Sequence, residues 1–178
     1  MFLRFGVGPL LVMGFGAMEA TPIEALLKTS VGEIRFELYP ENAPKTVANF
    51  LKYVDGGHFE GGSFYRVVRM DNQIQNKVKI EVIQGGLSGK TDIVSYEPTQ
   101  LERTSVTGLI NDQPSLDFGG KRNPDGQRFA AFGRVIEGMD IVRKIQRMKT
   151  IPRDPDELEY ASGQYLEKPV CFLFFRRL

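Results

Sequence analysis

Short segments with the residue pattern of β-strands, separated by glycine and proline, restrict the possible folds of this chain more than any other feature. In the first of them, Ile34, Phe36 and Leu38 alternate with polar residues, which is the period of a half-buried strand. Further segments rich in β-branched or aromatic residues lie at 63–68, 79–83, 129–136 and 169–175. Because these segments do not alternate regularly with helices, the pattern favours a closed or nearly closed antiparallel β-barrel.

The segments before and between these strands predict a hairpin and two helices. A turn at residues 30–32 joins the first strand to an apolar run at 23–27, which predicts an opening β-hairpin. A helix is expected to begin at 42–44, with a proline in its first turn, and to end at 55–57. Apolar residues at helical spacing in 141–148 predict a second helix. We therefore expect a mainly β domain with two helices that cap the barrel.

Composition excludes several classes of function. Lys and Arg total 23 against 22 Asp and Glu, so a net charge of +1 gives no reason to expect a nucleic-acid partner. With one cysteine and one histidine, the chain has no internal disulfide and no zinc site of several Cys or His ligands. His58 lies among turn residues and no Gly-x-Ser-x-Gly motif occurs, which disfavours a Ser/His/Asp triad. We expect no metal and no cofactor.

The first twenty residues differ from the rest of the 178-residue chain. Arg4 precedes a charge-free stretch at 5–18, and small residues follow before Thr21, an arrangement that resembles a secretory signal peptide. This stretch is shorter than the roughly 18 residues of a spanning helix, so no stable membrane insertion is expected. The interpretation is a signal-like segment at 1–20 and one domain at 21–178, exported to the periplasm or secreted. The alternative is a mistakenly extended start on a cytoplasmic protein.

Four sequence blocks carry a specific resemblance to a known family. They lie at 44–50 (PKTVANF), 64–68 (FYRVV), 82–86 (VIQGG) and 129–135 (FAAFGRV). Together and in this order they resemble the cyclophilin family of peptidyl-prolyl cis-trans isomerases, over nearly everything from about residue 23 to the C-terminus. The resemblance implies a cyclophilin-like antiparallel barrel capped by two helices. It also implies isomerisation of X-Pro bonds during protein folding.

The chemistry of that reaction suits a chain with so little histidine and cysteine. Amide resonance sets a barrier of roughly 18 to 20 kcal/mol to rotation about an X-Pro bond. A catalyst has to weaken the resonance and hold the twisted state, for which an apolar pocket, a cationic donor and a polar positioning group are enough. The expected partners are proline-containing polypeptides, and the expected state is a monomer.

The resemblance also assigns the site residues. Arg66 matches the catalytic arginine of the family, and Gln84 matches its substrate-positioning glutamine. Val82, Leu116 and Phe129 match positions that line the proline pocket. Arginine suits the first role because its planar guanidinium stays charged and offers several donors. The alternatives are structural: Arg66 as cover for a barrel face, Gln84 as a strand-end residue, and Leu116 and Phe129 as plain core.

Departures from the family pattern lie around these residues. Tyr65 stands where the family usually has histidine, Phe129 stands where many members have the pocket histidine, and a polar insert occupies 69–79. After Leu109 the chain passes almost directly to Asn111, where the family has two strands and their turn, roughly 20 residues. The barrel is therefore expected to lack one hairpin. The alternative function is a catalytically weak proline-peptide-binding module or chaperone on the same scaffold.

Overall fold

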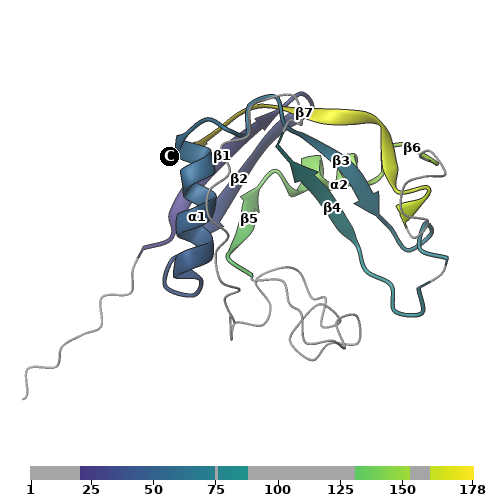
Figure 1. Ribbon diagram of the computed structural model, residues 1–178, viewed down its shortest axis with the longest axis horizontal. Helices are drawn as coiled ribbons and strands as arrows, with labels where there is room; N and C mark the ends of the chain where they lie inside the picture. The colour runs from purple at the N-terminus through teal and green to yellow at the C-terminus, as the bar shows by residue number, and fades with distance from the viewer. Residues whose placement is uncertain (1–20, 75, 88–130, 153–160) are drawn as a thin grey trace, which may run out of the picture.

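The computed structural model describes residues 21–74, 76–87, 131–152 and 161–178. Within these ranges the chain is mainly β, with a curled antiparallel half-barrel sheet and two helices (Figure 1), which confirms the expected class. The elements are β1 (Ile23–Thr29), β2 (Gly32–Leu38), α1 (Pro44–Asp55), β3 (Ser63–Val68), β4 (Val82–Gly86), β5 (Gly133–Glu137), α2 (Met139–Gln146), β6 (Thr150–Ile151) and β7 (Tyr165–Arg177). The strand order is β4-β3-β7-β1-β2-β5, and β6 also pairs with β7.

Strand β7 joins the two halves of the sheet (Figure 1). Its C-terminal part pairs with β1, where Ala25 lies opposite Arg177. Its N-terminal part pairs with both β3 and β6, and Tyr165 lies opposite Arg66 on one side and Ile151 on the other. The start of β7 is therefore placed directly beside the predicted catalytic arginine.

Two hydrophobic clusters lie on the curled sheet. The first packs α1 against the sheet through Val47, Leu51 and Val54, which recur at helical spacing and are buried. The second lies under α2 around Ile145, and Val67 of β3 belongs to it. Phe36 and Phe64 pack against both clusters. The buried members of the first cluster are Ala25, Leu27, Leu38, Ala43, Val47, Leu51, Val54, Phe172 and Phe175. The buried members of the second cluster are Ile34, Val67, Ile145, Leu166 and Val170.

Local sequence signals placed the opening hairpin and the first helix correctly. The Thr29 hydroxyl donates to the Gly32 carbonyl at 2.7 Å and accepts from the Val31 N–H at 3.2 Å, which closes the turn between β1 and β2. Pro44 is the first residue of α1, and Gly56 follows its last residue. Strand β3 has the predicted bounds.

The other strand boundaries differ from the sequence pattern. Strand β4 begins at Val82 instead of residue 79, because both backbone groups of Ile80 bind the side chain of Gln73. Strand β5 begins at Gly133 within the predicted 129–136 segment, of which 129–130 lie outside the described residues. Strand β7 extends the predicted segment at both ends, and the two-residue β6 had no signal in the sequence.

Several predictions lie outside the described residues: the signal-like segment at 1–20, the missing hairpin after Leu109, and the pocket residues Leu116 and Phe129. They stay predictions. In the described parts of the chain, neither helix has the length and apolar character needed to cross a membrane.

Candidate active site

A β-bulge in β3 brings the predicted arginine and glutamine together. Phe64 lies opposite Gly85 and Arg66 lies opposite Gln84, so Tyr65 is an extra residue on β3. Two consecutive side chains of β3 therefore reach Gln84. Arg66 Nη1 donates to Gln84 Oε1 at 2.9 Å, and Gln84 Nε2 donates to the Tyr65 hydroxyl at 2.9 Å. The two ends of one amide thus connect Arg66 to the tyrosine that departs from the family pattern.

A second glutamine holds the guanidinium from another direction. Gln164 Oε1 accepts from Arg66 Nε at 3.0 Å and from Nη2 at 2.6 Å. The Gln164 side chain is only 2% exposed. It lies immediately before β7, and sequence reasoning missed it because a glutamine after a turn carries no local signal of a contact 98 positions away.

Val82 is placed on the same ladder as Gln84. It is the first residue of β4, lies opposite Val68 and is half-buried. Because side chains alternate along a strand, Val82 and Gln84 share one face of β4. The described part of the predicted site therefore consists of Arg66, Gln84 and Val82 on two paired strands.

The polar insert at 69–79 is fastened to the site through Asn72. Its side-chain amide donates to the carbonyls of Val67 at 3.0 Å and Gly163 at 3.3 Å. Its own backbone carbonyl accepts from Gln164 Nε2 at 2.9 Å. The insert therefore contacts both β3 and the residues that lead into β7.

Arg69 fastens the beginning of the same insert to the end of α2. Its Nη1 donates to the carbonyls of Gln146 at 3.3 Å and Met148 at 3.1 Å. Carbonyls at a helix C-terminus lack partners within the helix and carry the negative end of its dipole, so a guanidinium there is favourable. The insert is thus held at two points.

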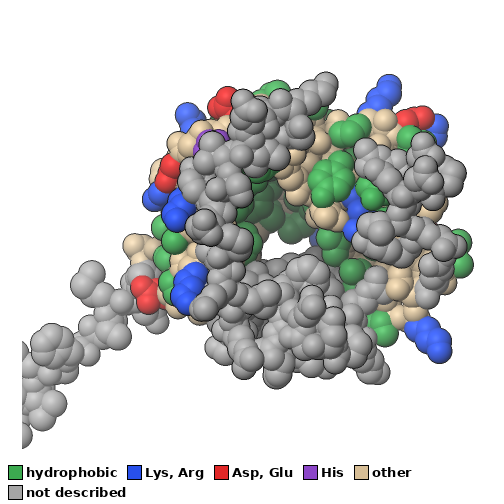
Figure 2. Space-filling model, viewed as in Figure 1, with side chains coloured by type: hydrophobic (Ala, Val, Ile, Leu, Met, Phe, Trp, Pro, Cys, Tyr) green, Lys and Arg blue, Asp and Glu red, His purple; other side chains and the backbone are tan. Residues whose placement is uncertain are grey.

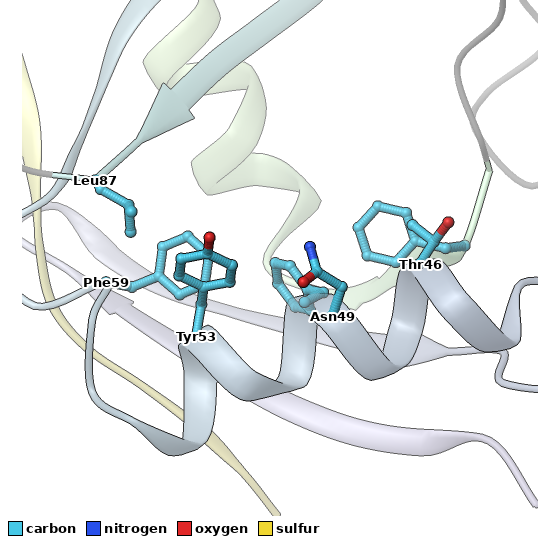
Figure 3. A pocket seen from close by; sticks show the side chains of 7 residues that line it. Thr46, Asn49, Tyr53, Phe59 and Leu87 are labelled. Carbon is cyan, nitrogen blue, oxygen red and sulfur yellow. The ribbon is translucent and has the colours of Figure 1, made fainter. Parts of the chain in front are cut away.

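An apolar cavity of about 290 Å³ lies next to α1 (Figure 3). In the space-filling view, hydrophobic side chains border a central hollow (Figure 2). Among the cavity's walls, Phe50 packs against Phe59 and Phe132, with ring centroids 5.3 and 5.1 Å apart. The buried Oδ1 of Asn49 accepts no hydrogen bond from the described residues. Arg66, Gln84 and Val82 are not among the lining residues, which are Thr46, Asn49, Phe50, Tyr53, Phe59, Leu87 and Phe132.

The arrangement around Arg66 is a fixed cationic donor beside neutral amides. A guanidinium in this setting can donate hydrogen bonds to a carbonyl oxygen or to an amide nitrogen whose lone pair has become available. Among the described residues, no group of three or more His, Cys, Asp and Glu side chains could hold a metal ion.

Comparison with known proteins identifies the family. The model of the cyclophilin type peptidyl-prolyl cis-trans isomerase/CLD family matches residues 25–113, which is half of the chain. The chain belongs to the cyclophilin family. The match contains the predicted site residues Arg66, Gln84 and Val82, whereas Gln164 lies outside it.

Curated relatives and a solved structure resemble this cyclophilin over most of its length. It is 34% identical over 139 residues to the peptidyl-prolyl cis-trans isomerase cyp18 of Streptomyces antibioticus, a match that covers 70% of this chain and 83% of the relative. It is 31% identical over 149 residues to peptidyl-prolyl cis-trans isomerase A of Dickeya dadantii, covering 73% and 74% of the two chains. The crystal structure of a cyclophilin type isomerase from Cryptosporidium parvum matches with a TM-score of 0.48 and 15% identity, covering 88% of this chain and 98% of that one.

Proposed function

We propose that this cyclophilin catalyses cis-trans isomerisation of X-Pro peptide bonds, with Arg66 as the transition-state donor. The observation that carries the proposal is the position of the Arg66 guanidinium, which is held by Gln84 on one side and Gln164 on the other. As the X-Pro bond twists, resonance is lost and the proline nitrogen gains a localised lone pair. A fixed cationic donor stabilises that nitrogen more than the planar ground state and so lowers the barrier.

The other predicted residues complete the proposed site. Gln84 accepts from Arg66 Nη1 and lies on the same face of β4 as Val82, so it is suited to place the substrate backbone while Val82 offers apolar contact. The family resemblance alone assigns Leu116 and Phe129, which lie outside the described residues, to the pocket for the proline ring. The proposed substrates are proline-containing polypeptide segments. Export and a monomeric state stay predictions.

The experiment that tests this function is the substitution Arg66→Ala. We expect the catalytic efficiency on an X-Pro peptide to fall by about 100-fold or more, or roughly 2.7 kcal/mol, because the donor to the twisted bond is lost. Isomerisation rates would be measured with circular dichroism as the check that parent and variant are folded.

Arg134→Ala is the matched control. Arg134 forms an ion pair with Glu37 on β2, and its strand β5 lies at the opposite end of the strand order from β3 and β4, so its removal should leave the isomerase activity per folded molecule unchanged. Equal activity of folded Arg66→Ala and the parent would contradict the proposed role of Arg66. If the parent binds a proline peptide without turning it over, the binding-module alternative is the better description.

A further inference from the structure

We infer that Gln164 is a positioning residue for the reaction, because its buried side-chain oxygen holds the guanidinium of Arg66 in the orientation that reaches Gln84. The inference rests on the proposed role of Arg66. Gln164 Oε1 accepts from both Nε and Nη2 of Arg66, at 3.0 and 2.6 Å. One fixed acceptor therefore binds two of the donors of the guanidinium fork, while Nη1 faces Gln84.

The hydrogen bonds of Gln164 determine the orientation of its own amide. Its Nε2 donates to the Asn72 carbonyl at 2.9 Å, so the oxygen end must face Arg66. The opposite orientation would place the NH₂ group against the guanidinium and the oxygen against a carbonyl, leaving donors facing donors. The backbone carbonyl of Gln164 accepts from the Val67 N–H at 2.8 Å, which fixes the residue beside β3.

This support is needed because a long arginine side chain has many rotamers. A donor accelerates a reaction only when it is held where charge develops, and holding it in advance avoids reorganisation during the reaction. Groups that support a catalytic side chain from behind therefore influence the rate without touching the substrate. The three hydrogen bonds to Gln164 and Gln84 restrict Arg66 in this manner.

The support that Gln164 gives comes from parts of the chain that lie outside the blocks of the family resemblance. Gln164 lies outside the residues matched by the family model, and its partner Asn72 belongs to the polar insert at 69–79. The insert thus has a role through Gln164. The backbone carbonyl of Asn72 orients the side-chain amide of Gln164, and this amide orients the guanidinium of Arg66.

The test replaces Gln164 with methionine, which has similar length but forms no comparable hydrogen bonds. With Gln164→Met, we expect kcat on an X-Pro peptide to fall by about 10-fold or more while KM changes by less than about twofold, because orientation of the donor acts in the transition state. In the Arg66→Ala background, the same substitution should lower activity by no more than about twofold, because its effect passes through Arg66.

A spectroscopic readout follows the hydrogen bond itself. In ¹⁵N-labelled protein, exchange of the Arg66 Nε–H with solvent should accelerate by about 10-fold or more in Gln164→Met, because the buried acceptor is lost. Assignment of the signal uses its absence in Arg66→Ala. If Gln164→Met does not fold, Gln164→Asn replaces it, since its amide is one methylene shorter and cannot reach the guanidinium from the same backbone position.

Thr29→Val is the control for loss of a buried polar group. Thr29 is also 2% exposed, and its two side-chain hydrogen bonds stay within the turn between β1 and β2. We expect this variant to be less stable, with the activity per folded molecule and the Arg66 Nε–H exchange within about twofold of the parent.

The outcomes separate the inference from the proposed function. If Arg66→Ala loses activity while Gln164→Met keeps its kcat and its Nε–H protection, the inference is overturned and the proposed function stands. If Arg66→Ala is as active as the parent, the proposed function fails. A loss of activity in Gln164→Met that is equally large in the Arg66→Ala background would also overturn the inference, because Gln164 would then act independently of Arg66.

Discussion

Two buried glutamines show how one residue type serves different purposes in this chain. Gln73 and Gln164 are each 2% exposed, and the side-chain amide of each is hydrogen-bonded at both ends. Gln164 binds a charged side chain of the proposed site. Among the described residues, the Gln73 side chain binds backbone groups, namely the carbonyls of Arg69 and Ile80 and the N–H of Ile80, and so ties the start of the insert to its end.

The substitution Gln73→Met should therefore lower stability. Loss of the Gln73 side-chain amide leaves backbone groups of the loop without their partner, and a buried unsatisfied polar group costs about 1 to 3 kcal/mol. Urea denaturation would measure the free energy of unfolding. The control is Gln146→Met, because Gln146 makes an exposed hydrogen bond to Glu81 and should change stability by less than about 0.5 kcal/mol. Equal stability of the two variants would show that the loop does not depend on Gln73.

At the scale of elements, charged side chains connect β5 to β2. Arg134 of β5 pairs with Glu37 of β2 at 2.9 Å, and Arg35 of β2 pairs with Glu137 of β5 at 2.8 Å. A hydrogen bond from the Tyr39 hydroxyl is the main cause that holds the pKa of Glu37 below its ordinary value of 4.5, and the contacts with Arg134 contribute less. Burial and the bond to Glu37 raise the pKa of Tyr39. The attachment of β5 therefore depends in part on an ionised Glu37.

This attachment should weaken in acid. A carboxyl group with a lowered pKa in the folded state stabilises the fold above its ordinary pKa, and the stabilisation is lost as the pH falls through the lowered value. As the pH falls below about 4.5, the free energy of unfolding should therefore decrease less steeply in Glu37→Gln than in the parent. The curves of unfolding free energy against pH for the two proteins should converge in acid. Denaturation at a series of pH values would measure this. If the Glu37→Gln curve ran parallel to that of the parent, the proposed role of Glu37 in acid would be refuted.

At the scale of the whole molecule, β7 connects the two halves of the sheet and both hydrophobic clusters. Val170 belongs to the cluster under α2, and Phe172 and Phe175 belong to the cluster under α1. The centroid of the Phe175 ring lies 5.4 Å from the ring centroid of Phe50 and 5.5 Å from the ring centroid of Phe36. One strand thus packs against α1, pairs with β1 and leads back to Gln164 beside the proposed site.

Truncation of Phe175 should therefore destabilise the whole fold. Its side chain is 8% exposed, and replacing a buried phenylalanine with alanine costs about 3 to 5 kcal/mol through lost burial and the cavity left behind. Chemical denaturation of Phe175→Ala would measure the loss. Leu173→Ala on the same strand is the control, because Leu173 is 52% exposed and its truncation should cost less than about 0.5 kcal/mol. Similar losses for both variants would contradict this account of the core.

Elements whose signals are local could be predicted from the order of the amino acids. Pro44 and Gly56 marked the ends of α1, and the turn at 30–32 placed the opening hairpin, because capping, turn formation and alternation depend on residues a few positions apart. Arg66 and Gln84 were predicted as site residues from blocks that resemble a family, and their roles stay predictions. The paired strands place them within hydrogen-bond distance across 18 positions.

Features that depend on residues far apart in the chain became visible once the folded arrangement was known. Strand β4 starts at Val82 because the side chain of Gln73 binds both backbone groups of Ile80. The bulge at Tyr65 is defined by the pairing of β3 with β4. The contact between Arg66 and Gln164 spans 98 positions. No periodicity of the chain encodes such a contact, because it depends on the pairing of β7 with β3, which brings the two side chains together.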